Sequence, residues 1–172
     1  MGSFVVSSPC RTGSTIILNN LLKNKNNTVV HNHNSEWQPP NSNFVCILSR
    51  RKDRFAAVVS HAVMDATKQP PHTYSSTVVS LTINVNRFRN LYLSHKIFYS
   101  KINLDSYKQV VEIWYEELIS DPYYLFRELG QHQQTDYTTI PKSPYDYSKL
   151  ITNYVQLQEV AKKIEQDLLY IK

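Results

Sequence analysis

The chain has 172 residues, about the length of one domain, and with 41% hydrophobic and 19% charged residues its composition excludes a disordered protein. No apolar run approaches the roughly 20 residues that span a bilayer, there is no signal-peptide pattern, and Cys10 and Cys46 are too few for a disulfide framework or a four-cysteine zinc site. The net charge of +5 favours an anionic partner, although the scattered Lys and Arg residues argue against nucleic acid, and a cytoplasmic protein is expected.

The first half of the chain alternates short apolar runs with segments of helical periodicity. The β-branched runs predict strands over 3–8, 28–31 and 44–48. The spacing of apolar residues predicts helices over 16–23 and 53–66. Polar segments at 9–15 and 34–43 are expected to be loops.

The second half continues this alternation. Helices are expected over 84–101, 122–129 and 155–169, a strand over 109–115, and loops over 67–77 and 131–147. Asp121 is the expected N-cap and Gly130 the expected C-cap of the middle helix. The aromatic residues of 88–99 indicate core packing, with a homodimer face or an acceptor-pocket wall as alternatives. We therefore predict one domain, 1–172, with a three-layer α/β fold and a central parallel sheet flanked by helices.

The loop at 9–15 is the first candidate site. A strand, a loop with Gly13 and a helix bring backbone N–H groups and the helix dipole to one point, which favours phosphate or sulfate. Arg11 adds a cation, and Ser14 and Thr15 add hydroxyl groups. The alternative is an ordinary strand-to-helix turn with an N-cap serine. The pattern is not Walker A, because Ser14 stands where the lysine follows the glycine.

The turn after the third strand is the second candidate site. Arg50, Arg51 and Ser60 are expected at the carboxyl edge of the sheet, where ligands bind in doubly wound folds. Cations at a helix N-terminus oppose the helix dipole, which argues for a bound anion. The alternative is a solvated basic start of the helix.

Together these segments resemble PAPS-dependent sulfotransferases, most closely the bacterial carbohydrate and glycolipid enzymes that act on trehalose. Residues 8–15 are similar to the 5′-phosphosulfate loop, and 50–60 to the 3′-phosphate motif, in which a serine follows an arginine nine residues later. Residues 114–122, 129–130, 142–143 and 151–154 are similar to later segments of the family, in the same order. The resemblance runs from about residue 4 to 160 and implies a P-loop-type fold.

The resemblance also implies roles for individual residues. Arg11 would touch the 5′-phosphosulfate, which the loop would cradle, whereas Arg51 and Ser60 would hold the 3′-phosphate. Tyr115 is similar to a tyrosine near the adenine, and Lys142 to a lysine that closes over the 3′-phosphate. The expected cofactor-binding residues are Arg11, Thr12, Gly13, Ser14, Thr15, Arg51, Ser60, Tyr115 and Lys142.

A general base is expected near the end of the second strand. Glu36 is similar to the carboxylate of the bacterial relatives, and His33 or His31 to the histidine of the cytosolic eukaryotic ones. The alternative to a catalytic role is that Glu36 is a loop carboxylate in solvent. No bound metal is expected. Arg11 joins Glu36 and His33 as a predicted catalytic residue, because it would stabilise charge on the phosphosulfate.

The predicted function is transfer of a sulfuryl group from PAPS to a hydroxyl or amine of a small-molecule or carbohydrate acceptor, with PAP as the product. Two alternatives stay open. One is a P-loop nucleotide or small-molecule kinase, and the other is a non-catalytic module that binds PAP or another polyanion.

Overall fold

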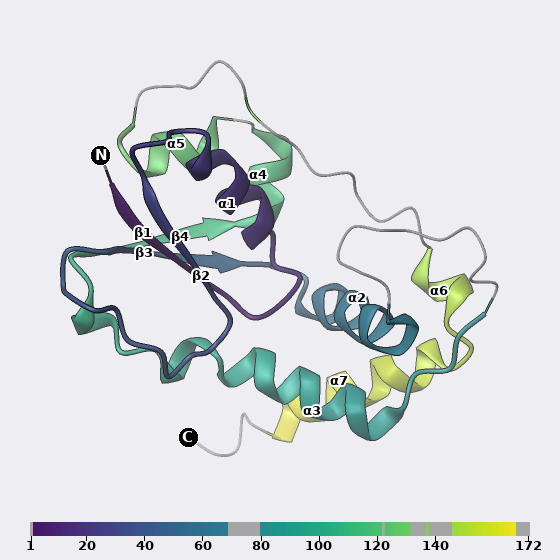
Figure 1. The fold of residues 1–172 in the computed structure, drawn as a ribbon. Coiled ribbons are helices and arrows are strands. Elements are labelled where there is room, and N and C mark those ends of the chain that lie inside the picture. The colour runs from purple at the N-terminus through teal and green to yellow at the C-terminus, as the bar shows by residue number, and fades with distance from the viewer. Residues whose placement is uncertain (1, 69–79, 122, 132–136, 138–145, 168–172) are drawn as a thin grey trace. The chain divides into compact units, whose positions relative to one another are not determined.

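The computed structural model describes residues 2–68, 80–121, 123–131, 137 and 146–167 (Figure 1). The chain divides into two compact units, Met1–Lys52 with Ile97–Ile140 and Asp53–Lys96 with Pro141–Lys172. Among the described residues, no helix has both the length and the apolar character needed to cross a bilayer.

The first unit contains a four-stranded sheet in which all neighbouring strands are parallel. Its strands are β1 (Ser3–Ser7), β2 (Thr28–Asn32), β3 (Val45–Arg50) and β4 (Gln109–Trp114), in the order β2-β1-β3-β4. The predicted α/β class and parallel sheet are therefore confirmed. In the register of the sheet, Ser7 pairs with both Asn32 and Leu48. The loops after β1, β2 and β3 consequently start at the same edge.

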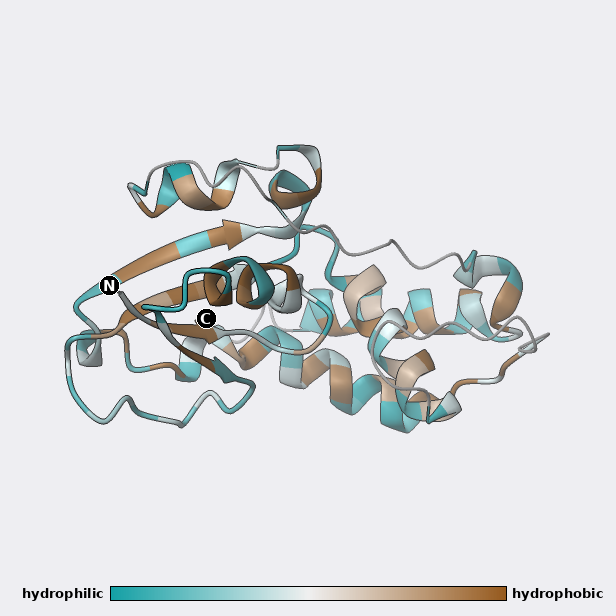
Figure 2. Ribbon diagram, turned by 45° about the horizontal axis from the view of Figure 1, so that its top comes forward, coloured by the Kyte–Doolittle hydropathy of each residue, from teal (hydrophilic) through white to brown (hydrophobic). Residues whose placement is uncertain are grey.

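Helices cover one face of this sheet. Side chains of α1 (Ser14–Leu22), α4 (Tyr115–Ser120) and α5 (Tyr124–Glu128) form one buried cluster with inward-facing residues of β1, β3 and β4. The opposite face is covered by Phe98, Ile102 and Tyr107, around two 3-10 turns at Tyr99–Lys101 and Leu104–Ser106. The strands carry the hydrophobic colour along most of their length in Figure 2. This pattern is typical of strands buried on both faces.

The structure corrects several predicted boundaries in this unit. β3 continues to Arg50, two residues beyond the apolar run, and α4 was not predicted at all. The helix expected over 122–129 spans only Tyr124–Glu128, although the carboxylate of Asp121 accepts a hydrogen bond from the N–H of Tyr123 at 2.8 Å. Gly130 has φ +62 directly after that helix, as expected for a glycine at a helix C-terminus.

The second unit consists of helices. They are α2 (Arg54–Thr67), α3 (Val85–Ile97), α6 (Tyr147–Leu150) and α7 (Tyr154–Asp167), of which α6 was not predicted. The Oδ1 atom of Asp53 accepts from the N–H of Ala56 at 2.8 Å and caps α2. α3 ends at Ile97 rather than at residue 101.

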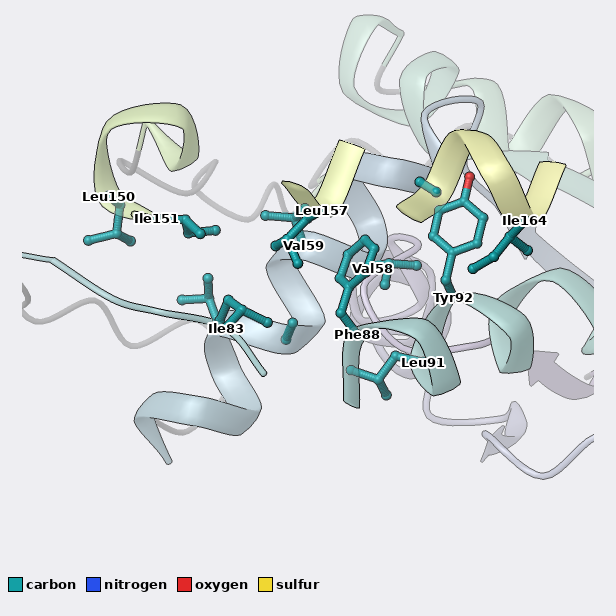
Figure 3. Close-up of a cluster of buried hydrophobic side chains, with 13 residues drawn as sticks. Val58, Val59, Ile83, Phe88, Leu91, Tyr92, Leu150, Ile151, Leu157 and Ile164 are labelled. Carbon is teal, nitrogen blue, oxygen red and sulfur yellow. The ribbon is translucent and has the colours of Figure 1, made fainter. Parts of the chain in front are cut away.

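A hydrophobic cluster joins these helices. Phe88 and Tyr92 of α3 lie against Val58 of α2 and against Leu157 and Ile164 of α7 (Figure 3). The predicted core role of these two aromatic residues is therefore confirmed. Burying an apolar side chain of this size stabilises a fold by about 1.5–3 kcal/mol.

A charged group lies beside this cluster. Glu165 of α7 accepts hydrogen bonds from the hydroxyl of Tyr92 at 3.0 Å and from Nζ of Lys96 at 2.6 Å. The same carboxylate forms an ion pair with Arg54 at the start of α2. Glu165 thus connects three helices of the second unit.

Candidate functional site

The loop between β1 and α1 has an unusual backbone. Arg11 has φ +67 and Gly13 has φ +90, so two of its residues adopt left-handed conformations. In the part of the chain that the structure describes, no acceptor is bonded to the N–H groups of Gly13, Ser14 and Thr15. No acidic residue lies in the first turn of α1. Free N–H groups at a helix start are a typical binding site for an anion.

Buried hydroxyl groups hold this loop in place. The Thr12 hydroxyl donates to the carbonyl of Pro9 at 3.1 Å, and the Ser49 hydroxyl donates to the carbonyl of Thr12 at 2.6 Å. Thr12 and Ser49 are both buried. The Thr12 side chain is therefore used within the protein, and only its backbone is left to face a ligand. Sequence reasoning did not identify Ser49.

Arg51 is a half-buried cation beside the loop. Its Nη1 lies 3.4 Å from the carbonyl oxygen of Arg11, and its Cζ lies 4.7 Å from the centre of the Tyr115 ring. Its Nε is buried and has no hydrogen-bond partner. No carboxylate among the described residues forms an ion pair with Arg51. The protein thus holds an uncompensated positive charge next to the free N–H groups.

Arg50, in contrast, is already paired. Its Nη2 lies 2.6 Å from Oε1 of Glu112, and its Cζ lies 4.3 Å from the Tyr99 ring and 6.0 Å from the Trp114 ring. The Tyr99 hydroxyl donates to the carbonyl of Ser49 at 2.5 Å, which fixes the ring. The Nε of Arg50 is also buried without a hydrogen-bond partner, so the two arginines differ in their carboxylate partner: Arg50 has Glu112, whereas Arg51 has none among the described residues.

The segment after β4 supports the turn that carries Arg51. The ring of Tyr115 lies beneath Arg51, whereas Glu116 accepts from the N–H of Lys52 at 3.1 Å with both carboxylate oxygens. Glu117 accepts from Nζ of Lys52 at 2.6 Å, and this hydrogen bond raises the pKa of Lys52. Tyr115 was expected near an adenine. In the structure its position is defined by Arg51 and by the loop glycine.

The two histidines at the end of β2 contact the same loop. Nε2 of His31 lies 2.9 Å from the hydroxyl of Ser14, and Nδ1 of His33 lies 2.7 Å from the carbonyl oxygen of Ser8. The two rings meet edge to face with their centres 4.3 Å apart. Partial burial of the His31 ring, followed by the charge of His33, lowers the pKa of His31 to about 4.

Glu36 lies in the loop after β2, and its side chain is 75% exposed. Its carboxylate lies 3.7 Å from Nζ of Lys101, and its N–H donates to Oδ1 of Asn34 at 3.0 Å. No group of three or more His, Cys, Asp or Glu residues in the described ranges is arranged to hold a metal ion. The histidines, not Glu36, are the titratable groups bonded to the loop.

Two predicted site residues are not among the described residues of the first unit. Ser60 belongs to the second unit, where it is buried on α2 with its Oγ 3.2 Å from the hydroxyl of Tyr147. Lys142 lies outside the described residues. The residues that the structure does place together are Arg11, Thr12, Gly13, Ser14, Thr15, His31, His33, Ser49, Arg51 and Tyr115.

Comparison of the chain with protein-family models, with curated proteins and with solved structures finds no match. The loop, Arg51 and the two histidines are therefore the features that bear on function.

Proposed function

We propose that the protein is a PAPS-dependent sulfotransferase that moves a sulfuryl group to a hydroxyl or amine of a small-molecule or carbohydrate acceptor. One observation carries the proposal: the guanidinium of Arg51 has no carboxylate partner among the described residues and is held on the Tyr115 ring beside the loop. Keeping such a charge half-buried is unfavourable unless an anion completes the site. The free N–H groups at the start of α1 suit the same anion.

In the proposed reaction, an oxygen or nitrogen of the acceptor attacks the sulfur of PAPS. A new bond to sulfur forms, the bond between sulfur and the bridging oxygen of the 5′-phosphate breaks, and PAP leaves with the electron pair. Negative charge then grows on the leaving phosphate, so donors that are already in position stabilise the transition state. Arg11, the N–H groups of Gly13–Thr15 and the hydroxyls of Ser14 and Thr15 would supply these donors. In keeping with the resemblance, Arg51 would hold the 3′-phosphate.

The acceptor must lose a proton, and His33 is the base that we propose. A carbonyl oxygen only accepts hydrogen bonds, so the contact with Ser8 requires a proton on Nδ1 of His33. In the neutral ring this leaves Nε2 with a lone pair and a fixed direction, as general base catalysis requires. Glu36 stays the alternative base, although its carboxylate lies next to Lys101 in solvent.

Calorimetry with PAP, ADP and AMP tests the proposal directly. The expected result is micromolar or tighter binding of PAP and at least tenfold weaker binding of ADP, because ADP lacks the 3′-phosphate. Equal affinity for ADP together with magnesium-dependent turnover of ATP would instead identify a kinase. Sequence-independent RNA binding that falls steeply with salt, without a preference for PAP, would identify a polyanion-binding module.

A further inference from the structure

The contact between His31 and Ser14 connects the end of β2 to the first residue of α1. Ser14 is 3% exposed, and its hydroxyl lies 2.9 Å from Nε2 of His31. Either group can be the donor in this pair, since a hydroxyl has one proton and two lone pairs and an imidazole nitrogen can carry a proton or a lone pair. The structure therefore contains a hydrogen bond whose direction depends on the proton of His31.

Two further observations favour an anion-binding site at this loop. The Oγ of Ser8 is buried and bonds to no described residue, and Arg51 has no carboxylate partner in the described part of the chain. An anion such as sulfate or phosphate accepts hydrogen bonds. If Ser14 gave its single proton to His31, it would present only lone pairs to the anion and would repel it. An anion can therefore accept a hydrogen bond from the Ser14 hydroxyl only when Nε2 of His31 is the donor to Ser14.

The surroundings of His31 determine how readily it takes up a second proton. The two elements packed against β2 are β1 and α1, and neither contains an ionisable side chain. His33, next to the end of the same strand, is the neighbouring titratable group that disfavours the charged ring. Arg11 of the loop and Arg51 of the turn beside it are the arginines of this region. An anion at the loop would supply the missing opposite charge and raise the pKa of His31.

We infer that His31 is a positioning residue that turns the Ser14 hydroxyl toward a bound sulfate or phosphate group, so that anion binding at this loop is coupled to protonation of His31. The inference rests on the proposed function, because it takes the loop as the site of the 5′-phosphosulfate. By linkage, protonation must strengthen anion binding by the same factor by which the anion favours protonation.

Inorganic sulfate is the appropriate probe, since its charge does not change between pH 5 and 8. Its affinity is measured from the backbone amide shifts of Gly13–Ile16, and the pKa of His31 from its imidazole proton shifts, with and without saturating sulfate. Wild type should bind sulfate about threefold to fivefold more tightly at pH 5 than at pH 7.5. The pKa of His31 should rise when sulfate is bound.

Two variants separate positioning from protonation. His31→Gln keeps an N–H donor for Ser14 but does not titrate. Its affinity for sulfate should therefore equal that of wild type at pH 7.5 and should not increase at pH 5. His31→Phe keeps the ring but has no donor, and should bind sulfate about threefold to tenfold more weakly at pH 7.5.

The possible outcomes distinguish this inference from the proposed function. If sulfate shifts the amides of the loop but leaves the pKa of His31 unchanged, or if His31→Phe binds as wild type does, the inference is wrong and the anion site stands. The inference is also wrong if His33→Gln, and not His31→Gln, abolishes the gain at pH 5. If no loop amide responds to sulfate at either pH, the proposed function fails, and the inference fails with it.

Discussion

Gly13 and Tyr115 are in direct contact, so close that a Cβ added to Gly13 would lie 2.8 Å from Cδ2 of the Tyr115 ring. The same ring carries the guanidinium of Arg51, whose Cζ lies 4.7 Å from the ring centre. One aromatic side chain therefore supports both the loop after β1 and the cation after β3. The glycine is required for two independent reasons, the positive φ of +90 and the lack of space for a side chain.

Substitution of this glycine should destabilise the first unit. Gly13→Ala adds about 1–2 kcal/mol for the left-handed backbone and about 1–3 kcal/mol for crowding against the ring, so a loss of about 2–5 kcal/mol in the free energy of unfolding is expected. Urea unfolding followed by tryptophan fluorescence measures this loss. Trp37 and Trp114 both belong to the first unit, so the signal reports on that unit.

Gly130 is the matched control, because it also has a positive φ, of +62, but a Cβ there would meet nothing within 4 Å. Gly130→Ala should therefore lower the free energy of unfolding only by the contribution of the left-handed backbone, about 1–2 kcal/mol. Equal losses for the two variants would show that the Tyr115 ring moves aside, and that the contact does not define the loop.

The two arginines of the turn should differ in their effect on ligand affinity. Arg51→Ala removes the unpaired cation and should weaken PAP binding about 10-fold to 100-fold, the range for a hydrogen bond to a charged group. Calorimetry at one fixed salt concentration measures the affinity, and urea unfolding checks that the variant is folded.

Arg50→Ala is the comparison variant, because the charge of Arg50 is already paired with Glu112 and its guanidinium packs on Tyr99. It should lower the stability of the first unit by about 1–2 kcal/mol and change PAP affinity by less than about twofold. If Arg50→Ala weakened PAP binding as much as Arg51→Ala, the distinction between a structural and a binding arginine would be wrong.

The α/β class and the four parallel strands could be predicted because β1, β2 and β3 are short apolar runs and β4 alternates apolar with polar residues. The end of β3 could not, since Arg50 is polar and is held in the strand by Glu112 and by two aromatic rings from distant segments. α4 was missed because Tyr115 follows β4 directly, with no turn residue between strand and helix.

The candidate site, like the fold, could be predicted only in part from the sequence. The glycine loop and Arg51 are recognisable from their order along the chain. The role of Ser49 depends on the register of β1 and β3, which pairs Ser7 with Leu48 and so brings Ser49 to the start of the loop. The contacts of His31 and His33 likewise depend on the pairing of β2 with β1. Such relationships are set by tertiary structure, and local patterns do not encode them.

The proposed base should be distinguishable from Glu36 by turnover. His33→Gln keeps an N–H group for the Ser8 carbonyl but has no site for a proton, so the rate of PAP release from PAPS with a carbohydrate acceptor should fall about 100-fold or more. Affinity for PAP should stay within about twofold of wild type. Glu36→Gln should reduce the rate by less than about threefold, and the reverse order of the two effects would identify Glu36 as the base.

Glu165 provides a prediction for the second unit. Its carboxylate faces Lys96, Arg54 and Tyr92 at the junction of three helices. Glu165→Gln leaves two cations without their partner, and we expect a loss of about 0.5–1.5 kcal/mol, a small value because the side chain is 40% exposed. Glu159→Gln on the same helix is the control and should stay within about 0.5 kcal/mol of wild type, because Glu159 is exposed and has no described ion pair.

The effect of Glu165 should also depend on pH in a defined direction. Burial raises the pKa of its carboxyl, but the hydrogen bond from Lys96 and the charge of Arg54 outweigh it, so the pKa lies below the ordinary 4.5. The unfolded chain therefore binds this proton more readily, and the stabilisation is complete above pH 4.5 and is lost as the pH falls through the lower, folded value. Urea unfolding followed by far-ultraviolet circular dichroism should show a constant difference between wild type and Glu165→Gln from pH 6 to 8, which shrinks below pH 4.5. A difference that persists unchanged in acid would show that packing, and not charge, accounts for the contribution of Glu165.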